Sequence, residues 1–272
     1  MTMFMACQWR VAILAIGLLA GCASVQSVPP EARSDLAPTG KLRVGLILSN
    51  QVLVTKDPQT GALRGVTVAL GEALAKRLVV PFEPVGYPNP AALVQSFGRN
   101  EWDIAFLAFD PARAQDVEFS PPYMVVDNTY LVPPGSTVES VEAVDQRGVK
   151  IAVPERSAPD LFLSRNLKAA EIVRVPGGDD AAIEVLRSGR ADAYAENAHM
   201  LSLYSDRLPG SRVLQGRYTV IQHAVATPKG RLAGAEFVKA FIEESKRDGT
   251  VRGAITQAGL RRTDVAPAAA TK

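Results

Sequence analysis

One arginine in the first half of the chain has the chemistry and setting to bind a small anion. The segment Asp110-Pro111-Ala112-Arg113 directly follows an apolar run that ends at Phe109. A guanidinium group forks onto a carboxylate through two parallel hydrogen bonds, and backbone N–H groups at a helix start add further donors. The pattern predicts a carboxylate site at Arg113. It also fits a surface arginine on a short helix that Asp110 caps and Pro111 begins.

Composition and motif content exclude several classes of protein. The chain has 272 residues, with 30 basic and 28 acidic side chains, and its net charge of +2 gives no electrostatic basis for nucleic-acid binding. Its two histidines, His199 and His223, stand apart from any cluster with metal-ligand spacing. The sequence has no glycine-rich phosphate loop and no Ser/His/Asp order with supporting context. We therefore expect no metal, no cofactor and no catalytic residues.

The N-terminus has the layout of an export signal. Arg10 precedes the apolar run Val11–Ala20, which is too short to span a bilayer as a mature helix. The run closes with Leu19-Ala20-Gly21-Cys22, which resembles a bacterial lipoprotein box. That resemblance implies that residues 1–21 are removed as a signal peptide and that Cys22 is lipidated. The alternative is an ordinary secretory signal, with the protein released into the periplasm.

The segment after the signal predicts an anchored protein on a tether. Cys22 is the only cysteine left after cleavage, so no internal disulfide can form. In Gram-negative lipoproteins, a residue such as Ala23 after the cysteine favours sorting to the outer membrane. Residues 22–40 are rich in proline and small residues, which indicates a flexible tether.

From Lys41 onward, strand-like and helix-like segments alternate. Leu42–Leu48 is a β-branched apolar run typical of a buried parallel strand, and Thr67–Leu78 has an apolar helical stripe that Pro81 ends. The same patterns predict strands at 103–109, 149–153, 171–175 and 191–196, and helices at 91–97, 159–167 and 180–187. Strands that alternate with helices indicate an α/β fold with largely parallel sheets.

Two segments of the chain share one plan. Residues 91–109 and 181–197 each contain an apolar helix, a small turn, an aspartate and a buried strand, which suggests two lobes of similar design. Apolar segments at 128–133 and 218–227 lie where the chain would leave the first lobe and return to it. We expect these segments to be hinge strands. Two lobes joined by two strands leave a cleft, where small ligands bind.

The order of motifs along the chain is more specific than any one of them. It is GKLRVG, TGALRGVTVALGEALAKRL, LVQSFGRNEWDIAFLAFDPARAQDVEFSPPY, GVKIAV, LRSGRADAYAEN and RDGTVRGAI. In this order the motifs resemble the family 3 extracellular solute-binding proteins, the amino-acid-type receptors of ABC importers. The likeness covers about Lys41 to Leu260. Its best single element is Arg113 followed by Phe119-Ser120-Pro121-Pro122-Tyr123.

The resemblance implies a fold, a function and partners. The fold is a two-lobed periplasmic-binding-protein-like (type II) clamshell, in which each lobe is a largely parallel sheet flanked by helices. Lobe 1 is expected at 41–130 and 228–262, lobe 2 at 131–227, and a disordered tail at 263–272. The implied function is capture of a small carboxylate-bearing solute, an amino acid or related organic acid, for the permease subunits of an ABC importer. We expect a monomer, anchored by lipid at the periplasmic face of a bacterial membrane.

The resemblance also implies ligand-binding roles for charged residues of the cleft. Arg113 matches the arginine of the family's Thr-x-x-Arg, which binds the ligand's α-carboxylate. Asp110 replaces the threonine of that motif and is either a ligand contact or only a helix cap. Glu196 stands where amino-acid receptors commonly carry an aspartate for the α-ammonium group. It also fits a helix-start carboxylate beside Asn197.

Four further residues are candidate ligand contacts. Ser157 would cap a helix whose free N–H groups could face an anionic ligand group. Arg156 replaces a glycine of the family and either adds a charge to the cleft or is a solvated loop residue. Asn50 follows the first strand, where the ligand-facing loop should lie. Tyr87 lies near the family's aromatic-lid region, or packs in the protein interior.

Two other functions are compatible with the sequence. A few relatives of this fold are periplasmic dehydratases that act on cyclic carboxylic acids, and Asp110 or Glu196 could serve as their acid or base. A lipid-anchored ligand sensor that is not coupled to transport is the other. Turnover of a cyclohexadienyl acid would favour the enzyme, and a permease and ATPase encoded nearby would favour the importer.

Overall fold

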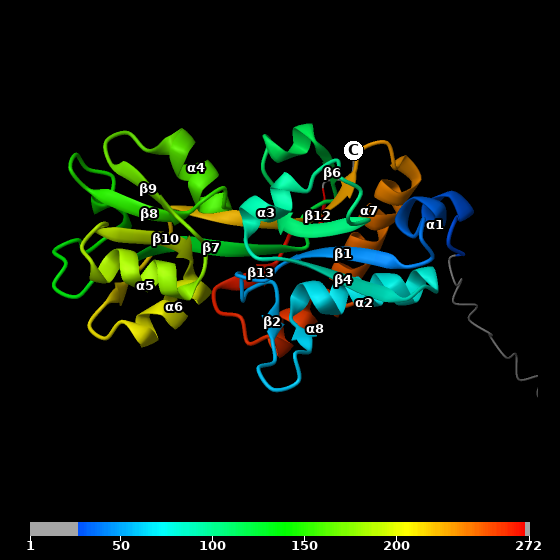
Figure 1. Cartoon of the computed structure of the whole chain (residues 1–272), viewed down its shortest axis with the longest axis horizontal. Coiled ribbons are helices and arrows are strands. Elements are labelled where there is room, and N and C mark those ends of the chain that lie inside the picture. Colours follow the sequence, from blue (N-terminus) through cyan, green and yellow to red (C-terminus); the bar gives the residue numbers. More distant parts are fainter. Residues whose placement is uncertain (1–26, 270–272) are drawn as a thin grey trace, which may run out of the picture.

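The computed structural model describes residues 27–269, which form two lobes side by side along the longest axis of the molecule (Figure 1). The predicted signal peptide and the lipoprotein box that ends at Cys22 lie outside the described residues. Within residues 27–269, no helix combines the length and the apolar character needed to cross a membrane.

The first lobe is built around three parallel strands. β1 (Leu42–Ile47) lies between β4 (Phe82–Tyr87) and β5 (Ile104–Ala108), and β5 is buried at every residue. Because helices cover this sheet, its inner strands carry continuous apolar runs rather than an alternating pattern. The helices of this lobe are α2 (Val66–Leu78), α3 (Pro90–Gln95), α7 (Leu232–Arg247) and α8 (Thr250–Gln257).

The second lobe repeats this arrangement. Its central strand β8 (Lys150–Pro154) pairs in parallel with β9 (Glu171–Val175) and β10 (Ala193–Asn197). Its helices are α4 (Ala158–Asn166), α5 (Asp179–Arg187) and α6 (Ala198–Arg207). The helices and strands that the sequence pattern predicted between residues 42 and 197 are present, with ends that differ by at most two residues, except that the connecting strand predicted at 128–133 begins four residues earlier, at Met124.

The internal sequence similarity has a structural counterpart in two aspartates. The Asp103 carboxylate accepts a hydrogen bond from the Arg43 backbone N at 3.0 Å, and the Asp192 carboxylate accepts one from the Lys150 backbone N at 2.8 Å. Each aspartate precedes the strand that lies between the central strand of its lobe and a connecting strand, β5 or β10, and fixes the start of the central strand. The two segments of similar sequence therefore perform the same structural task in both lobes.

Two long antiparallel strands connect the lobes (Figure 1). β7 (Met124–Val132) and β12 (Thr219–Pro228) pair with each other. β12 also pairs with β5 of the first lobe, and β7 with β10 of the second. The resulting order of strands is β4-β1-β5-β12-β7-β10-β8-β9. The remaining short elements are β2 (Thr55–Lys56), β3 (Leu63–Arg64), η1 (Arg113–Gln115), β6 (Val117–Phe119), η2 (Val141–Ala143) and β11 (Arg212–Val213).

The prediction of a tether through residue 40 is wrong for its second half. Residues Pro30–Leu36 form helix α1, which packs on α7. Ala32 and Leu36 are four residues apart, so they lie on one face of the helix, and both are buried. The Asp35 carboxylate accepts a hydrogen bond from the Gly234 backbone N of α7 at 2.9 Å. Proline and charge content suggested a tether, but two apolar residues are enough to dock this helix.

The prediction of a disordered tail from residue 263 is also wrong for the residues that the structure describes. Thr263–Val265 forms β13, which pairs with β7 in antiparallel fashion, and Ala266 is buried. The Lys246 Nζ on α7 donates a hydrogen bond to the Pro267 carbonyl at 2.8 Å. Backbone pairing to an open strand edge needs no apolar sequence pattern, so the composition of the tail gave no sign of it.

Candidate functional site

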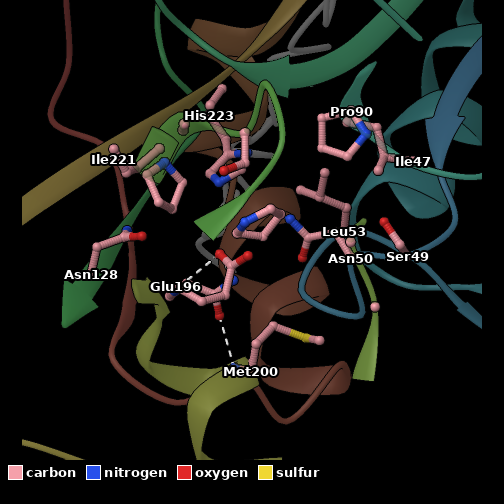
Figure 2. A pocket seen from close by; sticks show the side chains of 18 of the residues that line it. Ile47, Ser49, Asn50, Leu53, Pro90, Asn128, Glu196, Met200, Ile221 and His223 are labelled. Atoms are coloured by element: carbon pink, nitrogen blue, oxygen red, sulfur yellow. Dashed lines mark hydrogen bonds between the residues drawn. The ribbon is translucent and has the colours of Figure 1, made fainter. Parts of the chain in front are cut away.

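A small cavity of about 40 Å³ lies between the two lobes. Figure 2 shows side chains that converge on it from the first lobe, the second lobe and the connecting strands. Both polar and apolar residues line it. The residues that line it include Ser49, Asn50, Ala108, Arg113, Asn128, Ser157, Gly177, Gly178, Glu196, Met200, Tyr204, Ile221 and His223.

Arg113 is the cation of the cavity. It is only 5% exposed, and it follows β5 at the start of η1, a short 3₁₀ helix of one turn. Its Nη1 donates to the Ala108 carbonyl at 2.9 Å, and its Nη2 donates across the cleft to the Arg156 carbonyl at 2.6 Å. Burial lowers the pKa of Arg113 to about 10, so the group stays charged at neutral pH. Its Nε is buried without an acceptor among residues 27–269.

Glu196 is the anion of the cavity. It lies near the end of β10, and one carboxylate oxygen accepts hydrogen bonds from the Asn197 backbone N at 2.8 Å and the Asn197 Nδ2 at 3.0 Å. Burial raises the pKa of Glu196 to about 7, against the opposing effect of these hydrogen bonds. The Asn197 side chain also caps helix α6. Asn197, which the start of α6 holds in place, therefore fixes the position of the Glu196 carboxylate.

Asp110 lies beside the cavity and not among the residues that line it. Its Oδ1 accepts a hydrogen bond from the Ala112 backbone N at 2.9 Å, as expected for a residue that shapes a helical turn. Its Oδ2 accepts one from Nη2 of Arg165 at 2.7 Å. Arg165 belongs to α4 of the second lobe, so Asp110 forms an ion pair across the cleft.

The loop after β8 places Ser157 and Arg156 differently. Ser157 lines the cavity, and its hydroxyl accepts a hydrogen bond from the Asp160 backbone N at 3.2 Å, which confirms the predicted cap of α4. Arg156 is exposed and has a left-handed backbone with φ of 56°, a conformation that suits the family's glycine. Its backbone carbonyl contacts Arg113, while its side chain is not part of the cavity wall.

Of the two remaining candidates, only one lines the cavity. Asn50 follows β1 and contributes to the wall, and its Oδ1 accepts a hydrogen bond from the Val52 backbone N at 3.1 Å. Tyr87 ends β4, is buried away from the cavity wall, and donates its hydroxyl proton to Glu101 at 2.7 Å. Its placement agrees with the packing alternative.

The connecting strands contribute residues that sequence reasoning missed. Ile221 and His223 of β12 and Asn128 of β7 line the cavity. Burial, with a smaller effect of the Arg113 charge, lowers the pKa of His223 to about 3, so its ring is neutral. The sequence feature that could have identified them is the alternation of side chains along a strand. Residues 221 and 223 lie on one face of the strand, which places a histidine beside an isoleucine. Gly177, Gly178, Met200 and Tyr204 were missed too.

The lobes touch on the other side of the cavity as well. Nε2 of Gln51 in the first lobe donates to the Asp179 carboxylate of α5 at 3.3 Å. A Cβ built on Gly177 would lie 3.5 Å from the Ser49 hydroxyl and 3.8 Å from the Asn89 Cβ, so the two loops approach closely. The structure is thus a closed clamshell, and the described residues that line the cavity include one cation, Arg113, and one carboxylate, Glu196. Within residues 27–269, no group of three His, Cys, Asp or Glu residues could hold a metal ion.

Comparison with known proteins agrees with this architecture. Residues 42–257 match the bacterial extracellular solute-binding proteins, family 3. The chain belongs to this family. Its members are solute-binding proteins, and a closed cavity between two lobes is consistent with that role.

Two relatives and one solved structure are informative. The ABC transporter glutamine-binding protein GlnH of Bacillus subtilis (strain 168) is 22% identical over 251 residues, which cover 88% of this chain and 91% of that protein. The L-cystine-binding protein TcyJ of Escherichia coli (strain K12) is 26% identical over 249 residues, or 90% and 92% of the two chains. An ancestral amino acid-binding protein, a precursor of cyclohexadienyl dehydratase, has a TM-score of 0.70 at 25% identity, and covers 83% of this chain and 97% of its own.

Proposed function

We propose that this family 3 solute-binding protein captures an amino acid, or a closely related small zwitterion, and delivers it to an ABC importer. The observation that carries the proposal is the pair of opposite charges in one closed cavity. Arg113 has a buried Nε–H that can donate to a ligand carboxylate, and Glu196 can accept from a ligand ammonium group. The relatives described above, a glutamine-binding protein and an L-cystine-binding protein, support this class of ligand.

The closed form explains how the ligand would be retained. Arg113 bonds to the second lobe through the Arg156 carbonyl, so the residue that would hold the carboxylate also joins the lobes. A ligand that gains contacts to both lobes only when they meet shifts the population toward the closed form. If the receptor closes only when ligand is bound, a permease can distinguish the occupied receptor from the empty one by the surface of the closed form.

A thermal-shift panel of the twenty common L-amino acids, L-cystine and simple organic acids tests the ligand class. We expect at least one amino acid to raise the melting temperature, and calorimetry then gives its Kd. Arg113→Ala should raise that Kd by about 30-fold to several thousand-fold, because the ligand carboxylate is then buried without its partner. Arg113→Lys should restore only part of the affinity, since an ammonium cannot supply the planar fork.

Arg147→Ala is the control, because Arg147 is an exposed arginine outside the cavity wall. It should leave the Kd unchanged. Wild-type affinity in a folded Arg113→Ala variant would contradict the proposal, as would a panel in which no amino acid stabilises the wild-type protein.

The proposed location is the periplasmic face of a bacterial membrane, through lipid on Cys22. The support is the lipoprotein-box sequence at residues 19–22 and membership of an extracellular binding-protein family. Metabolic labelling with palmitate should mark the wild-type protein and not Cys22→Ser. Equal labelling of both would refute the lipid anchor.

An enzyme on the same fold is the second candidate. The observation that favours it is Glu196, a carboxyl group whose pKa of about 7 suits general acid–base work. The similarity to a precursor of cyclohexadienyl dehydratase adds to it. Incubation with a cyclohexadienyl carboxylic acid, followed by ultraviolet absorbance of an aromatic product, distinguishes the two. We expect no turnover, and turnover that Glu196→Gln abolishes would replace the receptor proposal.

A further inference from the structure

Asn128 occupies an unusual place for a polar side chain. It lies in β7, a strand that connects the lobes, and it is only 1% exposed. It lines the cavity between the lobes, and Figure 2 shows its amide on the same side of the cavity as Ile221. Asn128 pairs with Asn197 across the ladder between β7 and β10, and both Asn197 and its neighbour Glu196 also line the cavity.

The orientation of the Asn128 amide is fixed by one hydrogen bond. Its Nδ2 donates to the Val126 carbonyl of the same strand at 3.0 Å. The amide oxygen is therefore the free end, and among residues 27–269 no group donates a hydrogen bond to it. A buried acceptor without a donor destabilises a protein, and such atoms are rare in folded chains. A leucine of similar size would avoid this penalty. The amide oxygen is therefore available to accept a hydrogen bond from a bound ligand.

The neighbouring groups determine the chemistry of that partner. Glu196 and the Asn128 Oδ1 are both acceptors, and they line one cavity from adjacent strands. An ammonium group has three N–H donors and can serve both acceptors at once, whereas a carboxylate has none to give. Arg113 offers the cavity the opposite chemistry, because its buried Nε–H is a donor without an acceptor among residues 27–269. The cavity thus has two acceptors for an ammonium group and a donor for a carboxylate.

We propose that Asn128 is a ligand-binding residue whose amide oxygen accepts a hydrogen bond from the ligand's ammonium group, beside Glu196. The proposal rests on the proposed function, because it assumes a zwitterionic ligand between the lobes. It adds a contact from a connecting strand, which belongs to neither lobe alone. Asn128 would therefore determine selectivity for amino acids over the corresponding acids that lack the amine.

The test compares L-glutamine with glutaramate, which has the same carboxylate and carboxamide but no α-amine. If the thermal-shift panel selects another amino acid, that amino acid and its deaminated analogue replace these two compounds. Asn128→Leu keeps the size of the side chain and removes the acceptor. We expect calorimetry to show a Kd for the amino acid about 10- to 100-fold higher, as for the loss of a hydrogen bond to a charged group. The Kd for the deaminated analogue should change less than about threefold.

Asn166→Leu is the matched control. Asn166 is an exposed asparagine of α4 whose Nδ2 also donates to a backbone carbonyl, that of Phe162, and it lies outside the cavity wall. This variant should bind both compounds like the wild type. If Asn128→Leu does not fold, Asn128→Ser, whose shorter side chain cannot reach the same point, should show the same loss of selectivity.

The outcomes separate this proposal from the proposed function. If both Asn128 variants bind the two compounds with wild-type Kd values, Asn128 does not contact the ammonium group. Equal weakening for both compounds would likewise overturn the proposal, because it would mean that Asn128 only shapes the cavity. Failure of the wild-type protein to bind any amino acid would instead remove the proposed function itself.

Discussion

The ion pair between Asp110 and Arg165 should contribute directly to ligand affinity, although neither side chain lines the cavity. The pair joins the turn after β5 to helix α4 of the other lobe at 2.7 Å. Separation of the lobes must break it, so its free energy belongs to the closed form alone. Arg165→Met keeps the aliphatic stem of the arginine and removes only the charged end.

The magnitude follows from the exposure of the two partners. The Asp110 side chain is 5% exposed and the Arg165 side chain 49%. Fully exposed pairs contribute up to about 1 kcal/mol, and removal of one partner from a fully buried pair costs about 3–5 kcal/mol. A pair with one buried and one half-exposed partner lies between these limits, at about 2 kcal/mol, which corresponds to about 30-fold in Kd. The whole effect appears in the Kd if the free receptor is mostly open.

Calorimetry with the amino acid that the thermal-shift panel selects measures this effect, and a matched control exists within the second lobe. Arg174 pairs with Asp160 at 2.9 Å, and these side chains have the same exposures, 49% and 5%. Both residues of this control pair move together when the lobes separate. Arg174→Met should therefore lower the melting temperature without a comparable change in Kd.

Two results would refute this reasoning. One is an unchanged Kd in Arg165→Met, which would mean that the pair adds nothing to closure. The other is an equal rise in Kd for Arg165→Met and Arg174→Met, which would show that any change in α4 weakens binding. A double-mutant cycle with Asp110→Asn should give a coupling free energy of about 1–2 kcal/mol.

Three further predictions concern pH and stability. Because the pKa of Glu196 is about 7, binding of an amino acid should weaken about tenfold for each pH unit below 7 and level off above it, and isothermal titrations in Glu196→Gln should lose this trend. The same raised pKa means that the folded protein holds this proton more tightly than the unfolded chain. Glu196 should therefore lower the free energy of unfolding as pH rises from about 4.5 to 7, which urea denaturation of wild type and Glu196→Gln compares. Leu36→Ala should lower that free energy by about 2–4 kcal/mol because Leu36 is fully buried beneath α7, whereas Leu232→Ala, at a residue 71% exposed, should change it by less than about 0.5 kcal/mol. A change in Leu36→Ala as small as that of Leu232→Ala would mean that α1 adds nothing to the fold.

The sequence was sufficient for features that depend on neighbours along the chain. Apolar runs and helical stripes predicted the helices and strands, because side-chain periodicity decides which local conformation can bury its apolar face. The two segments of similar sequence predicted two lobes, and Asp103 and Asp192 perform matching tasks in them. The order of motifs was sufficient for the family, since the same order of elements specifies the same sheet.

The tertiary structure alone decided which groups meet. Asp110 is close in sequence to Arg113, but its partner Arg165 lies 55 residues further along the chain, and only the closed lobes bring them together. Strand register decided that Asn128 and His223 face the cavity, because a shift of one residue would turn both side chains to the opposite face of the sheet. Local patterns predict what each segment becomes, whereas contacts across the cleft depend on how the two lobes fit against each other.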